Sequence, residues 1–203
     1  FNIAGYIRKL TKLVDVGGVP MGGDMPIRVQ TMTNTNTNNT EKTVEQSVRA
    51  ILAGAEYIRI TAQGVKEARN ISEIIKKLHE RGYATPIIAD IHFNPKVALE
   101  AVKYAQKIRI NPGNYTDKSR NTKAVFSADD YKHDLQIAEE KFSALLDACK
   151  QHDVAIRIGV NHGSLSQRIM TKYGDTPVGM AYSAIEFLQI CQRHNFHKLV
   201  VSM

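Results

Sequence analysis

The tripeptide Ile-Arg-Ile occurs three times in this chain, centred on Arg59, Arg109 and Arg157. Each copy lies in a short apolar run typical of a β-strand, where an unpaired arginine is costly to bury. Because side chains alternate between the two faces of a strand, the isoleucines and the arginine point in opposite directions. If the isoleucines pack under helices, the three guanidinium groups share the other face. Such a cluster indicates an anion, and the planar guanidinium suits phosphate or diphosphate.

Strand-like runs alternate with helix-like runs along the chain. The expected strands are Ile27–Thr31, Tyr57–Thr61, Pro86–Ile91, Lys107–Asn111, Ala155–Val160 and Lys198–Ser202. The expected helices are Glu41–Ala53, Val65–Arg81, Pro95–Lys103, Ala128–Gln151 and Val178–Arg193. The Asn/Thr tract before the first helix can supply its N-cap. Strict alternation calls for a parallel sheet with right-handed crossovers.

Two layouts fit this order, an open doubly wound sheet and a TIM-type (β/α)8 barrel. Polar residues end nearly every expected strand, and functional groups spread over the carboxyl ends of many strands are typical of the barrel. We therefore predict an α/β barrel. A barrel typically needs about 250 residues, and this chain of 203 residues reaches only its sixth strand. We expect residues 1–203 to be a barrel domain truncated after about six strands.

Composition narrows the class of protein. Hydrophobic residues make up 43% of the chain, enough for a sizeable core, and no apolar run has the length of a membrane helix. The net charge of +7 also occurs in nucleic-acid-binding proteins, but aromatic residues are only 7% and no nucleic-acid-binding signature is present. An anionic small molecule explains the charge equally well. We expect a cytoplasmic protein with neither a nucleic-acid nor a membrane partner, and with Cys149 and Cys191 as buried free thiols.

Further polar residues share the face of the arginines. Asp90 and His92 lie at the end of the third expected strand. There they can bind a metal, transfer protons or hydrogen-bond a substrate. Two ligands alone do not make a metal site, so we expect no metal ion here. Asn111 and Asn161 keep the parity of the arginines that precede them, and the loop after Asn161 offers backbone N–H groups to a phosphate oxygen. Asp90 cannot neutralise three cations, which favours a bound anion over an ion-pair network that only fills the barrel.

Several long motifs, in order along the chain, resemble the 4-hydroxy-3-methylbut-2-enyl diphosphate synthases, iron–sulfur enzymes of the methylerythritol phosphate route to isoprenoids. They are VGGVPMGG from Val16, PIRVQTMTNT from Pro26, and ADIHFNPKVALEA, KIRINPGN and RIGVNHGSLSQRI further along. The resemblance runs from about Arg8 to Met203, and Tyr115–Lys150 is its least informative stretch. The last motif is similar to the longer subtype, found in some bacteria and in plants, which carries an extra domain.

The resemblance implies a barrel that binds methylerythritol cyclodiphosphate and faces a separate carboxyl-terminal domain with a 4Fe–4S cluster. It implies a two-electron reductive ring opening with loss of water, fed by flavodoxin or ferredoxin, in a full-length homodimer. The matching diphosphate and substrate contacts are Arg59, Asp90, His92, Arg109, Asn111, Arg157 and Asn161. The cysteines of this chain do not match the cluster ligands. We therefore expect no cofactor in this chain and no catalysis by it alone.

Two other interpretations remain open. A pterin-binding barrel of the dihydropteroate synthase type shares the architecture and also positions a diphosphate, although three mid-strand arginines fit it less well. The other is a diphosphate-binding barrel without catalytic activity.

Overall fold

The computed structural model describes residues 9–92, 94–116 and 127–203. A sheet of six parallel strands runs in sequence order, formed by β3 (Gln30–Met32), β4 (Tyr57–Thr61), β5 (Ile87–Ile91), β6 (Lys107–Ile110), β7 (Ala155–Gly159) and β8 (Leu199–Ser202). An uninterrupted order is that of a (β/α) barrel, whereas a doubly wound sheet reverses its order at a switch point. The predicted barrel-type α/β fold with six strands is confirmed.

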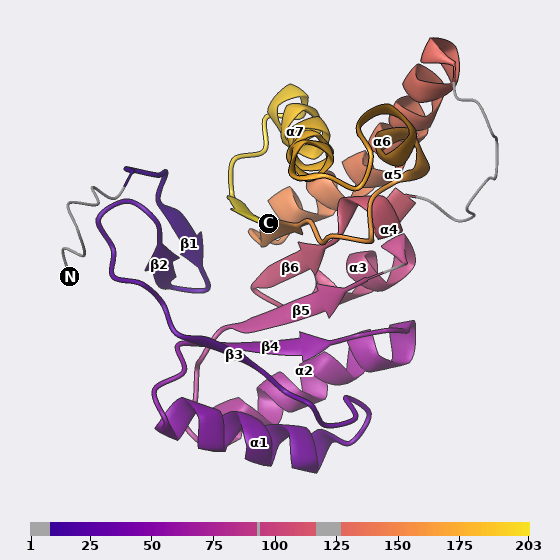
Figure 1. Ribbon diagram of the computed structural model, residues 1–203. Helices are drawn as coiled ribbons and strands as arrows, with labels where there is room; N and C mark the ends of the chain where they lie inside the picture. Colours follow the sequence, from indigo (N-terminus) through magenta and orange to yellow (C-terminus); the bar gives the residue numbers. More distant parts are fainter. Residues whose placement is uncertain (1–8, 93, 117–126) are drawn as a thin grey trace.

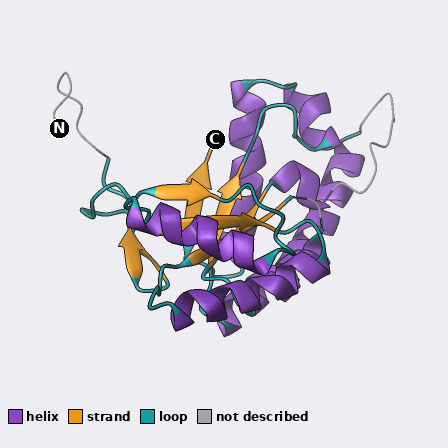
Figure 2. Ribbon diagram, turned by 90° about the horizontal axis from the view of Figure 1, so that it is seen from below, coloured by secondary structure: helices purple, strands orange, loops and turns teal. Residues whose placement is uncertain are grey.

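Helices pack side by side on one face of the sheet (Figure 1), and Figure 2 shows them outside the strands. They are α1 (Thr40–Leu52), α2 (Val65–Glu80), α3 (Pro95–Ala101), α5 (Ala128–Gln151) and α7 (Pro177–Arg193). All the expected helices are thus present. Asn39 caps α1 by accepting a hydrogen bond from the Lys42 amide at 3.1 Å, as expected of the Asn/Thr tract. Among the described residues, none of the helices combines the length and apolarity needed to cross a bilayer.

Some elements depart from the prediction. The hairpin of β1 (Val14–Val16) and β2 (Val19–Met21) precedes the sheet, and its strands are too short to show a periodic pattern. The short helices α4 (Pro112–Thr116) and α6 (Gln167–Tyr173) occupy expected loops. Within the stretch Tyr115–Lys150, residues 117–126 lie outside the described part of the chain.

The first strand begins later than expected, at Gln30 instead of Ile27. The Glu56 carboxylate accepts a hydrogen bond from the Val29 amide at 2.8 Å and forms an ion pair with Arg28 at 2.6 Å. The Glu56 side chain therefore occupies the Val29 amide, a backbone donor that would pair with the neighbouring strand if β3 began earlier.

The two faces of the sheet differ in character. The isoleucines beside the three arginines are all fully buried under the helices: Ile58, Ile60, Ile108, Ile110, Ile156 and Ile158. On the opposite face, the hairpin residues Val14 and Val16 pack against Tyr57, Ile88 and Ala155 near the amino ends of the strands. The hairpin thus covers the amino-terminal end of the inner face. It does not cover the polar side chains, which lie toward the carboxyl ends of the strands.

Candidate functional site

The three arginines meet on the face opposite the helices, as strand parity predicts. Arg109 of β6 pairs in register with Arg157 of β7 on one side and with Asp90 of β5 on the other. Arg59 extends from β4 to the carboxylate of Asp90. We call Arg59, Arg109 and Arg157 the arginine cluster. Because three cations share one face, each repels the others, and this repulsion must be offset.

Asp90 offsets part of that repulsion. Its Oδ2 atom accepts a hydrogen bond from Arg59 Nη2 at 2.6 Å, and its Oδ1 atom accepts one from Arg109 Nη1 at 3.3 Å. The carboxylate is fully buried, whereas the side chain of Arg59 is 19% exposed. One negative charge against three positive charges leaves the cluster with a net positive charge.

Arg157 carries the least neutralised charge. Its Nε donates to Ser202 Oγ at 2.9 Å, and it has no ion pair with a carboxylate in the described part of the chain. Burial lowers the pKa of the Arg157 guanidinium, and the charges of Arg59 and Arg109 lower it further. Burial likewise lowers the pKa of Arg109, against the opposing effect of Asp90.

Sequence reasoning missed two residues that shape this cluster. Ser202 pairs in register with Gly159, which lies two residues after Arg157 and so shares its face; the parity rule would have found the serine. Gly159 leaves room for Arg109, because a Cβ atom there would lie 2.6 Å from Arg109 Nε. The Gly159 carbonyl also accepts a hydrogen bond from Arg109 Nη2 at 3.3 Å.

His92 joins the cluster through its neighbours. Its Nε2 atom lies 3.1 Å from Asp90 Oδ2 and 3.3 Å from Arg109 Nη1. A guanidinium at this distance opposes the binding of a metal cation by the imidazole. Among the described residues, no group of three or more His, Cys, Asp or Glu side chains is placed to hold a metal ion.

The two predicted asparagines differ in how they contribute. In the amide orientation that satisfies both of its polar atoms, Asn161 Oδ1 accepts from Arg109 Nη2 at 3.1 Å. Asn111 is fully buried, and its Oδ1 atom accepts from the Gly113 amide at 3.2 Å. Asn161 therefore contacts the arginine cluster directly, and Asn111 lies beside the cluster at the end of β6.

Three buried donors at this site have no hydrogen-bond partner among the described residues. They are Arg59 Nε, Arg109 Nε and Asn111 Nδ2. Native proteins seldom leave buried donors unpaired. A ligand that offers only acceptor oxygens, such as a phosphate group, matches an excess of donors.

The loop after Asn161 is different from our prediction. The Gly163 amide donates to the Asp175 carboxylate at 3.1 Å, and the Ser164 amide donates to the Asn161 carbonyl at 3.2 Å. The expectation of free amides for a phosphate oxygen is therefore wrong at these two positions. The loop instead packs tightly on the segment after β6, since a Cβ atom on Gly113 would lie 2.0 Å from the Ser164 carbonyl oxygen.

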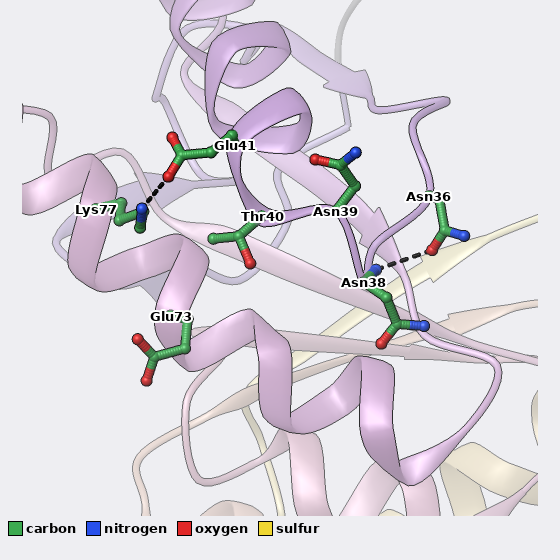
Figure 3. Close-up of a pocket in the computed structure, with 7 residues that line it drawn as sticks. All are labelled: Asn36, Asn38, Asn39, Thr40, Glu41, Glu73 and Lys77. Atoms are coloured by element: carbon green, nitrogen blue, oxygen red, sulfur yellow. Dashed lines mark hydrogen bonds and ion pairs between the residues drawn. The ribbon is translucent and has the colours of Figure 1, made fainter.

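A hollow of about 590 Å³ lies elsewhere, between the start of α1 and α2 (Figure 3). Its lining residues are Asn36, Asn38, Asn39, Thr40, Glu41, Glu73 and Lys77. Glu41 and Lys77 form an ion pair across it, and the Asn36 side chain accepts from the Asn38 amide at 2.9 Å. The hollow shares no residue with the arginine cluster and holds no excess of positive charge, so we do not assign the anion to it.

Comparison with known proteins places the whole arrangement in context. The model of the GcpE TIM-barrel domain family matches residues 11–203. The 4-hydroxy-3-methylbut-2-en-1-yl diphosphate synthase (flavodoxin) of Bacteroides thetaiotaomicron is 50% identical over 203 residues, which is 100% of this chain and 33% of that protein. The chloroplastic, ferredoxin-type synthase of Oryza sativa is 48% identical over 197 residues, covering 97% of this chain and 26% of that protein. The chain thus spans about a third or less of the length of these relatives.

Solved structures support the fold alone. A phospho-2-dehydro-3-deoxyheptonate aldolase from Thermotoga maritima aligns over 95% of this chain and 45% of its own, with a TM-score of 0.54 and 13% identity. A truncated form of 3-deoxy-D-arabino-heptulosonate 7-phosphate synthase from the same organism gives a TM-score of 0.55 at 12% identity, over 95% of this chain and 56% of its own. The likeness at such low identity extends to the barrel-type architecture and not to the chemistry.

Proposed function

This chain belongs to the GcpE family, and from that membership we propose that it is the substrate-binding barrel of a 4-hydroxy-3-methylbut-2-enyl diphosphate synthase. The full enzyme would open 2-C-methyl-D-erythritol 2,4-cyclodiphosphate to 4-hydroxy-3-methylbut-2-enyl diphosphate, taking up two electrons and losing water. Residues 1–203 would form its amino-terminal barrel, and an iron–sulfur domain would follow. Family membership favours this function over pterin binding by a dihydropteroate synthase-type barrel.

The observation that carries the proposal is the net positive charge of the arginine cluster. Three guanidinium groups converge on one face, and Asp90 is the carboxylate that pairs with two of them. The phosphate groups of a cyclic diphosphate carry two negative charges, and their oxygens act only as hydrogen-bond acceptors. Such a ligand therefore supplies both the missing charge and partners for the unpaired donors.

We assign the seven predicted residues distinct parts in binding. Arg59, Arg109 and Arg157 hold the diphosphate, while Asp90 fixes the first two of these guanidinium groups in place. Three polar side chains beside the arginines reach the oxygens of the substrate: His92, Asn111 and Asn161. Binding energy from the diphosphate, which does not itself become reduced, orients the carbons that react.

The described residues do not fit a 4Fe–4S cluster. Cys149 in α5 and Cys191 in α7 are both buried, and burial raises the pKa of both thiols, which opposes thiolate ligation. We therefore place the cluster in the remainder of a homodimeric enzyme, fed by flavodoxin or ferredoxin as the relatives' names indicate. We expect no turnover by this chain alone, and its cytoplasmic location stays a prediction.

Calorimetric titration with methylerythritol cyclodiphosphate tests the binding site. Replacement Arg157→Met removes a cation that has no carboxylate partner among the described residues, so it leaves no unpaired negative charge behind. Hydrogen bonds to charged groups contribute about 1.5–3 kcal/mol, so we expect affinity to fall roughly 10- to 100-fold.

The matched control is Arg193→Met, an exposed arginine of α7 that pairs with Glu139 on the outer surface. This variant should bind as the wild type does. Equal affinities of the wild type and Arg157→Met, in folded protein, would refute the assignment of the arginine cluster as the diphosphate site.

A further inference from the structure

A fourth cation lies on the same face as the arginine cluster. Lys107 begins β6, two residues before Arg109, and pairs in register with Ile88 of β5 and Ala155 of β7. Only 1% of the residue is exposed. Its position places it on the amino-terminal side of the cluster, under the hairpin that covers this end of the inner face.

The described contacts of the Lys107 amine are with uncharged groups. Its Nζ atom lies 4.7 Å from the centre of the Tyr57 ring and 3.6 Å from Met21 Sδ of the hairpin. The Tyr57 hydroxyl is itself engaged, donating to the Val19 carbonyl at 2.7 Å. Lys107 has no ion pair with a carboxylate in the described ranges of the chain. A ring face and a thioether offset only part of the hydration that a buried ammonium loses.

Charge repulsion adds to this loss of hydration. Burial, together with the positive charge of Arg157, lowers the pKa of Lys107 to about 8. The other groups that face the amine do not change charge between pH 7.5 and 9.5. Arg109 and Arg157 remain cations, and Tyr57 remains neutral because burial raises its pKa. Met21 and the register partners Ile88 and Ala155 do not titrate. Among the described groups around the amine, Lys107 is thus the one that can gain a proton.

We propose that Lys107 is a fourth cation of the anion site and takes up a proton when a diphosphate binds to the arginine cluster. The inference rests on the proposed function for the identity of the ligand, though any multivalent anion at the cluster would have the same effect. The bound anion supplies the negative charge that the amine lacks and reverses the repulsion from Arg157. Lys107 acts through the electric field and need not touch the ligand.

A proton taken up on binding makes affinity depend on pH. Below about pH 8 the amine is protonated in both states, so it adds no pH dependence. As the pH rises further, the free protein loses this proton while the complex retains it, and affinity falls. A cyclic diphosphate is a suitable probe because each phosphorus carries a single strongly acidic oxygen, so the ligand does not titrate in this range.

The test is calorimetric titration with the cyclodiphosphate at pH 7.5, 8.5 and 9.5, which measures the affinity at each pH. At pH 8.5 the titration is repeated in a second buffer of different ionisation enthalpy, and the difference in heat gives the number of protons taken up. For the wild type we expect affinity to fall roughly 10-fold from pH 7.5 to 9.5 and roughly half a proton to be taken up at pH 8.5. For Lys107→Met we expect roughly 10-fold weaker binding at pH 7.5 and less than about a 2-fold change with pH. The control Lys103→Met removes an exposed lysine paired with Glu100 and should behave as the wild type.

Each failure has a separate signature. No proton uptake by the wild type, or an unchanged pH profile in Lys107→Met, overturns the role of Lys107 even if the diphosphate binds. If the cyclodiphosphate does not bind, the titrations are repeated with sulfate, a dianion throughout this pH range. Sulfate binding with the expected dependence on Lys107 would support this inference and refute the proposed substrate. No binding of either anion would refute both the proposed substrate and the role of Lys107. The number of protons taken up is measured on the wild type, so this test does not depend on the folding of a variant.

Discussion

The two faces of the parallel sheet are built from the same three tripeptides but have opposite chemistry. On the outer face, the isoleucines on both sides of each arginine are fully buried under helices. On the inner face, the arginines between them meet Asp90 and one another. Burial of an isoleucine side chain contributes about 1.5–3 kcal/mol, whereas confining like charges costs free energy. The outer face therefore stabilises a fold in which the inner face remains short of negative charge, as an anion site requires.

The largest expected effect breaks this division, because one inner residue also supports the fold. Replacement Asp90→Asn keeps the shape of the side chain but removes the charge that pairs with Arg59 and Arg109. Loss of one partner from a buried ion pair costs about 3–5 kcal/mol, so we expect the free energy of unfolding in urea to fall by about that amount. Asp147→Asn, at an exposed position of α5, is the control and should be neutral. A stable Asp90→Asn variant would show that the arginines do not depend on Asp90.

A substitution on the outer face sharpens the comparison. Ile158→Ala leaves a cavity under the helices, and we expect a loss of about 2–5 kcal/mol in the free energy of unfolding. The affinity of the remaining folded protein for the cyclodiphosphate should stay within about 2-fold, because the inner face is unchanged. Ile185→Ala, at a position of α7 that is 41% exposed, should cost much less. A selective loss of binding in Ile158→Ala would contradict the separation of the two faces.

The smallest expected effect concerns pH and the inner face alone. Lys107 has a pKa of about 8 in the folded chain and near 10.4 when unfolded, so the unfolded chain binds more protons between these values. Stability should therefore rise with pH from about 8 to 10, by roughly 2 kcal/mol. Urea unfolding of the wild type and Lys107→Met at pH 7.5 to 10 measures it. The difference between the two proteins should shrink as the pH rises, and a constant difference would rule out a buried titrating amine.

Strand parity accounts for most of what could be predicted about the site. It correctly placed Arg59, Arg109 and Arg157 with Asp90, because a run of alternating residues has no other way to bury its isoleucines. The same rule would have included Ser202, which we overlooked. The hairpin gave no signal, since three-residue strands are shorter than any periodic pattern.

Backbone donors were harder to predict. The amides of Gly163 and Ser164 looked available in the sequence, but the first is taken by Asp175, which lies 12 residues later, and the second by Asn161. A side chain that far along the chain can reach such a donor only when the intervening helix, α6, returns it to the loop. No local pattern records that return.

The sequence by itself determined which residues share a face, because alternation along a strand is a property of the backbone and needs no partner. It also determined the order of strands and helices, which leaves few topologies for a parallel sheet. Tertiary structure alone decided that Asp90 pairs with Arg59 and Arg109 while Arg157 turns to Ser202. It alone decided that Lys107 lies between a tyrosine ring and a methionine, with no ion-pair partner among the residues that the structure describes. These contacts join atoms of different strands and of the hairpin, and their distances depend on register, twist and packing that no single segment contains.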